Sequence, residues 1–183
     1  MISIVLAAAA AAAPALTPEK VGAMIDGQGA ARTVATLSAG DLSKHNLYFD
    51  NVLDGISSGN AKWLALVPRL RPGTDGASGE FLRIAIARAL PHNAAGVLRL
   101  SAHGWPVADA CSYPMIEPRP ADTGRYFATA IPAVQAVRDP GLQAAKAICL
   151  SELQKAQKTV KHSVGPHPTV PTSTLYSNTS TRS

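Results

Sequence analysis

Three helical segments follow one another in residues 60–100, whose sequence is NAKWLALVPRLRPGTDGASGEFLRIAIARALPHNAAGVLRL. The first begins after Asn60, a residue type that caps helices by accepting a backbone N–H bond in the first turn. Its apolar residues recur at helical spacing: Trp63, Leu64, Val67 and Leu70. Pro68 lies inside this segment, so it kinks the helix or divides it into two short turns. The pair Pro72-Gly73 ends the segment.

The second segment is expected to start near Asp75 or Ser78 and to stop at Pro91, because proline removes a backbone donor. Its apolar stripe is wide, which is typical of a helix that is buried on more than one side. The stripe consists of Phe81, Leu82, Ile84, Ala85, Ile86, Ala89 and Leu90. Asn93 can cap a third segment. We expect these segments to form the core on which both ends of the chain dock.

The composition favours an all-α protein. Apolar residues make up 46% of the 183 residues and aromatic residues only 5%, so that mostly Ala, Leu, Ile and Val must fill the core. Many alanines and the lack of alternating apolar and polar positions favour helix over strand. The sequence therefore predicts one compact helical bundle or short α-solenoid of about six to seven helices.

The two ends of the chain differ from the middle. Residues 1–15 are uncharged and almost wholly apolar, too short for a membrane span, and end in Ala13-Pro14-Ala15, which fits signal-peptidase cleavage. Because no Lys or Arg precedes the apolar run, a low-complexity tail is the alternative to a signal peptide. Residues 16–160 form the predicted helical domain, and residues 161–183, rich in Pro, Ser and Thr, the predicted disordered tail.

The two cysteines predict a disulfide. In an exported chain, Cys111 and Cys149 most simply bond to each other. Cys149 belongs to the apolar stripe of a last helix that Asp139 can cap, and Cys111 lies in residues 102–120, the longest stretch expected to be irregular. The bond would attach that loop to the last helix. Neither cysteine is in a C-x-x-C motif, and two ligands do not complete a zinc site.

The charge and the motifs exclude several classes of function. The formal charge is +5, and the basic residues are dispersed, which does not argue for nucleic-acid binding. The histidines lack metal-ligand spacing, and we find neither a phosphate-binding loop nor a nucleophile elbow, so that no metal and no cofactor are expected. Asp50 and Asp54 lie four residues apart and fit an exposed acidic helix face better than a catalytic pair.

The strongest binding candidates are tryptophans and arginines, the residue types enriched at protein interfaces. They are Trp63, Arg69 and Arg71, joined by Arg83 and Trp105. The alternative is that Trp63 belongs to the core and the arginines to the solvated surface. No catalytic residue is predicted. A triad of Ser101, His103 and Asp109 can be written down, but neighbours in sequence do not establish triad geometry.

Several stretches together resemble a group of exported helical proteins of proteobacteria without an established activity. They are Gly59-Asn60-Ala61-Lys62-Trp63-Leu64-Ala65-Leu66, Arg71-Pro72-Gly73-Thr74-Asp75, Ala89-Leu90-Pro91, Cys111-Ser112-Tyr113-Pro114-Met115-Ile116-Glu117 and the helix that runs from Asp139-Pro140 to Cys149. The resemblance covers most of the mature chain. It implies an exported helical protein and assigns no functional residue.

The main functional hypothesis is a periplasmic or secreted, non-catalytic helical module that binds another protein, for example as an immunity or inhibitor protein. It implies no nucleic-acid partner and no stable membrane span, and it leaves the oligomeric state open. A cell-envelope hydrolase that uses His103 with Asp109 or Glu117 is the alternative, and it requires these groups to converge in a cleft. A structural helical spacer is a third hypothesis.

Overall fold

The computed structural model describes residues 16–39, 48–114 and 120–163, and this part of the chain is helical and has no strand. The α-helices are α1 (Pro18–Gln28), α2 (Ala30–Ser38), α3 (Tyr48–Ser57), α4 (Ala61–Leu64), α5 (Val67–Leu70), α6 (Gly76–Arg99), α7 (Val107–Ala110), α8 (Pro120–Gln135) and α9 (Gln143–Ser163). Short 3-10 turns are η2 (Arg71–Gly73), η3 (Leu100–His103) and η4 (Pro140–Leu142). The predicted all-α fold is confirmed.

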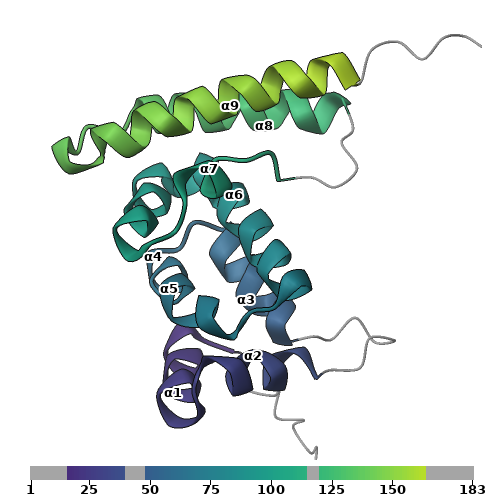
Figure 1. Cartoon of the computed structure of the whole chain (residues 1–183), viewed down its shortest axis with the longest axis vertical. Coiled ribbons are helices and arrows are strands. Elements are labelled where there is room, and N and C mark those ends of the chain that lie inside the picture. Colours follow the sequence, from purple (N-terminus) through teal and green to yellow (C-terminus); the bar gives the residue numbers. More distant parts are fainter. Residues whose placement is uncertain (1–15, 40–47, 115–119, 164–183) are drawn as a thin grey trace, which may run out of the picture.

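The helices form a compact body with α6 at its centre (Figure 1). Helices α8 and α9 lie side by side as a layer at one end of the view, and α1 and α2 lie at the other end. Between them, α6 contacts α8 on one side and α3 and α4 on the other. The predicted signal peptide lies outside the described residues, as does all of the predicted tail beyond Ser163, the last residue of α9.

Helix α6 carries ten buried residues, as its wide apolar stripe predicted, although Phe81 at the edge of that stripe is 49% exposed. Leu82, Ile86 and Leu90 are completely buried in the core. The helix begins with a capping box: the Asp75 carboxylate accepts the Ser78 N–H at 3.0 Å, and the Ser78 hydroxyl accepts the Asp75 N–H at 2.9 Å. These bonds satisfy N–H groups that would otherwise lack a helical partner.

Pro91 lies in the last turn before the break in α6 at Asn93, so the first helical part ends within two residues of the stop that the sequence predicted. Proline lacks an N–H, so the carbonyl of Ala87, one turn earlier, loses its helical donor. The hydroxyl of Tyr126, which comes from α8, donates to that carbonyl at 3.0 Å. Tyr126 is almost fully buried, and this burial raises the pKa of its hydroxyl, which keeps it protonated as a donor. The tertiary contact thus replaces the missing helical bond.

The break in α6 comes at Asn93, the residue expected to cap a third segment. Its backbone is non-helical (φ −152°, ψ 66°), and its side-chain oxygen accepts the Gly96 N–H at 2.9 Å. Asn93 therefore caps the helical turns that follow it, as predicted. The position of Pro68 is also explained: α4 and α5 are separate turns, and Pro68 lies in the first turn of α5, where no donor is missing.

The disulfide between Cys111 and Cys149 is present, with both residues fully buried. The bond attaches the end of α7 to α9. Tyr113, two residues after Cys111, packs with Tyr126 and Phe127 of α8 in an aromatic cluster. The stretch 102–120 is more regular than expected, because it contains the end of η3 and all of α7. In the described part of the chain, no helix combines the length and apolar character needed to cross a membrane.

Candidate functional site

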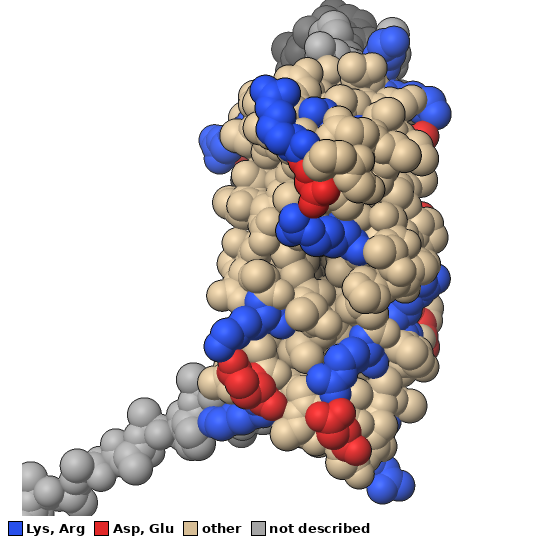
Figure 2. Space-filling model, turned by 90° about the vertical axis from the view of Figure 1, so that its left-hand side faces the viewer, with Lys and Arg blue, Asp and Glu red and all other residues tan. Residues whose placement is uncertain are grey.

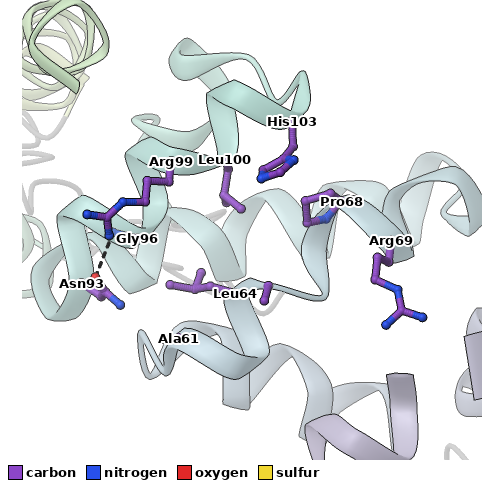
Figure 3. A pocket seen from close by; sticks show the side chains of 10 residues that line it. Ala61, Leu64, Pro68, Arg69, Asn93, Gly96, Arg99, Leu100 and His103 are labelled. Atoms are coloured by element: carbon purple, nitrogen blue, oxygen red, sulfur yellow. Dashed lines mark hydrogen bonds between the residues drawn. The ribbon is translucent and has the colours of Figure 1, made fainter. Parts of the chain in front are cut away.

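A groove runs between the α4–α5 turns and the end of α6 with η3. It encloses a cavity of about 520 Å³, and Figure 3 shows the ten residues that line it. One wall carries Ala61, Leu64, Ala65, Pro68 and Arg69, and the other carries Asn93, Gly96, Arg99, Leu100 and His103. On the second wall the spacing is three or four residues, which places these side chains on one helix face. The exposed Ala61 and Ala65 and the half-buried Pro68 make the surface predominantly apolar, while Leu64 and Leu100 are almost fully buried.

Two hydrogen bonds between the walls fix the two ends of the groove. At one end the Asn93 side-chain amide donates to the Gly59 carbonyl at 2.8 Å. At the other end the Arg71 guanidinium donates to the Gly104 carbonyl and lies over the ring of Trp105, 5.2 Å from its centroid. Since each bond joins the two walls just beyond the lining residues, the groove has a fixed width and a short length.

Cationic side chains border this apolar surface. In Figure 3 the Arg99 side chain extends over the end that holds Asn93 and Gly96, Arg69 lies at the opposite end, and His103 points toward Pro68. None of the ten lining residues is acidic. The acidic partners of the two arginines come from outside the lining: Asp139 lies 3.2 Å from Arg99, and Asp26 lies 2.5 Å from Arg69.

The wider surface has no single basic block. Figure 2 shows Lys and Arg side chains spread over the face in view, several of them next to Asp or Glu. The ion pairs of the described residues include Lys62 with Glu19, whose charged atoms are 2.7 Å apart, and the ammonium group holds the pKa of the carboxyl below its usual value. Exposed pairs of this kind contribute little to stability. Because exposed pairs are weak, the arginines of the groove, which form pairs of the same kind, remain available to a partner.

Of the five predicted binding residues, Arg69 alone lines the groove. Trp63 is half-buried, and its ring is so close to Gly55 that a Cβ there would approach it to 2.6 Å. Trp105 is buried and holds Arg71 at the end of the groove. Arg83 is bound to Glu80 and to the Ser112 hydroxyl. The sequence therefore indicated the neighbourhood of the groove more than its lining.

Arg83 has a structural role in the fold. Its Nε donates to the Glu80 carboxylate at 2.8 Å, which holds the pKa of Glu80 below its usual value and raises that of Arg83. Its contact with Ser112 joins α6 to the end of α7. These partners account for this side chain without a ligand.

The residues proposed for hydrolysis are not gathered in the groove. His103 is exposed and lines it, whereas Asp109 is exposed on α7 and does not belong to the lining. Glu117 lies outside the described residues. In the part of the chain that the structure describes, no three His, Cys, Asp or Glu residues come together as a possible metal site. The groove thus presents one imidazole and two guanidinium groups as its chemistry.

A second cavity, of about 340 Å³, lies between α2, α3 and the start of α6. It is lined by Phe49, Asp50, Asp75 and the half-exposed Phe81, among others. Asp50 and Asp54 are both exposed, as expected for an acidic helix face, and only Asp50 borders this cavity. Residues 40–47, next to it in the chain, are outside the described part.

Three comparisons with known proteins were made for this chain. No protein-family model, no curated protein and no solved structure matches it. The site must therefore be interpreted from its own residues. The spacing of Asn93, Gly96, Leu100 and His103 is the signal that could have found this wall, but residues 102–120 were expected to be irregular, which left His103 as a hydrolase candidate and Arg99 without a role.

Proposed function

We propose that this chain is an exported, non-catalytic helical module that binds another protein through the groove between α4–α5 and the end of α6. The observation that carries the proposal is a groove with an apolar surface and a cavity volume of about 520 Å³. Arg69, Arg99 and His103 border it, and none of its ten described lining residues is acidic. Arginine beside a concave apolar surface is typical of sites that grip a protein partner.

Export to the periplasm or the cell exterior is part of this proposal. Disulfides persist in oxidising compartments, and the bond between Cys111 and Cys149 fits such a place. The apolar, uncharged sequence of residues 1–15 is consistent with a signal peptide. Binding is favoured over hydrolysis because the groove offers His103, while Asp109, one of the carboxylates named for a hydrolase, does not line it.

The experiment that tests the proposal blocks the groove without disturbing the core. Ala65 is exposed and lines the groove, so that Ala65→Trp would fill it. Ala144, exposed on α9, provides the matched control Ala144→Trp. Crosslinking of the purified chain in a native envelope fraction, followed by reconstitution with the identified partner, should give a stoichiometric complex that Ala65→Trp abolishes and Ala144→Trp retains. A chain without any partner at micromolar concentration would contradict the proposal.

A further inference from the structure

We infer that the groove takes an acidic, amphipathic helix of the partner protein, with apolar side chains on Ala61, Ala65 and Pro68 and a carboxylate beside Arg99 or Arg69. The inference rests on the proposed function and names the chemistry of the partner. Its three supports are the shape of the groove, the charge at its border and the exposure of its lining.

The shape fits a short helical segment. The lining of the α4–α5 wall spans residues 61–69, about two helical turns or roughly 12 Å, and that of the other wall spans residues 93–103, nearly three turns or roughly 15 Å. A helix laid in such a groove contacts it through apolar residues at positions i, i+3 or i+4, and i+7, which also span two turns. Ala61 and Ala65 are small and exposed on the α4–α5 wall, so that the backbone of a docked helix can approach closely.

The charge favours an acidic partner. Both arginines of the lining are accessible, since the side chain of Arg99 is 60% exposed and that of Arg69 is 39% exposed. Their acidic partners, Asp139 and Asp26, form solvent-exposed ion pairs, which contribute little free energy, and Arg69 also donates to the Gly22 carbonyl at 3.1 Å. A carboxylate of the partner can therefore join or replace them at small cost. The formal charge of +5 would also steer an acidic protein toward this chain.

The exposure favours a helix over a lipid with a carboxylate head. Ala61, Ala65 and His103 are all exposed, so that an acyl chain in the groove would remain in contact with water along its length. An amphipathic helix instead buries its apolar stripe against the groove and keeps its polar face in water. An amphipathic helix therefore covers the open side of the groove with its polar face, whereas an acyl chain would remain in contact with water there.

The test places a photo-crosslinking side chain, p-benzoylphenylalanine, at Ala65 of the full chain and, as a control, at Ala144. After irradiation in the native envelope fraction, the segment attached at Ala65 is sequenced by mass spectrometry. We expect an acidic segment with apolar residues three and four positions apart, and no adduct of that segment at Ala144. A neutral or basic segment, a lipid adduct, or a complex without an adduct at Ala65 would overturn the inference and leave protein binding to be judged separately. The absence of any complex would overturn the proposed function as well.

A synthetic peptide of the attached segment then tests the charge. Arg99→Glu should weaken its affinity at least about tenfold, because it replaces attraction by repulsion at the contact. Arg88→Glu is the matched control, since Arg88 is exposed on the same helix, changes the net charge equally and does not line the groove. Equal weakening by both variants would show that only the net charge matters, and would overturn the placement of the carboxylate beside Arg99.

Discussion

The two sides of helix α6 differ in how completely the neighbouring helices cover them. Toward α8 and α9 it is closed: Tyr126 completes its hydrogen bonds at Ala87, and the buried disulfide attaches α7 to α9. Toward α4 and α5 it leaves a groove whose ends alone are tied, by Asn93 and by Arg71. We propose that the closed side of this helix supplies stability and the open side binding, so substitutions on the two sides should have different effects.

The largest effect is expected on the closed side, from removal of the disulfide. The bond joins residues separated by 38 positions, and closing a loop of this length stabilises the fold by about 4 kcal/mol in the chain-entropy model. The double variant Cys111→Ser/Cys149→Ser should lower the free energy of unfolding by about that amount in urea denaturation. A loss below about 1 kcal/mol would mean that α9 is held by its packing alone.

A pair of small-to-large substitutions compares the two sides directly. Ala130 is completely buried in α8, so Ala130→Leu overpacks the core and should cost about 1–3 kcal/mol. Ala65 borders the groove, so Ala65→Leu should change the free energy of unfolding by less than about 0.5 kcal/mol. Thermal or urea unfolding measures both variants. Equal losses would contradict the difference between an open and a closed side.

The bond from Tyr126 to the Ala87 carbonyl gives a smaller effect with an internal control. Tyr126→Phe leaves this buried carbonyl without a donor and should cost about 1–2 kcal/mol. In the Pro91→Ala background the new backbone N–H can supply the helical bond, so the cost of Tyr126→Phe should fall markedly. A double-mutant cycle measures this coupling. Additive losses would show that the tyrosine does not compensate for the proline.

The smallest effect is expected at the tied end of the groove. Asn93→Ala removes the cap of the last turns of α6 and the bond to Gly59, and should cost about 1 kcal/mol. Asn93→Asp keeps the acceptor for Gly96, but it loses the donor to Gly59 and sets a carboxylate against that carbonyl, so it should weaken the contact between the walls and spare the cap. If Asn93→Asp binds the partner as well as the native chain does, the tie at this end is not required for the groove.

Much of this fold could be predicted from sequence, because its signals are local. The caps at Asn60 and Asn93, the buried stripe of α6 and the pairing of the two cysteines all follow from residue type and spacing. The hydroxyl that replaces the donor missing at Pro91 could not be predicted, since it comes from Tyr126, 39 positions from the Ala87 carbonyl that it reaches. Local sequence rules identify the donor that a proline removes, but they do not identify the distant side chain that replaces it.

The candidate site was less predictable for the same reason. Residue type selected Trp63, Arg71, Arg83 and Trp105, whose partners within the fold explain them. A groove depends on which helix faces remain apart, and that is decided by contacts between α4–α5 and α6 that sequence spacing does not contain. Arg99 is a lining residue only because the fold brings its wall of the groove next to Leu64 and Pro68.

The division of α6 into a structural side and a binding side is tested most directly by hydrogen exchange of the full chain with and without its crosslinked and purified partner. Amides of residues 61–68 and 96–103 should exchange more slowly in the complex, while those of α8 and α9 should be unchanged. Slower exchange confined to α8 and α9, or no change along the described chain, would contradict the assignment of the groove as the binding site.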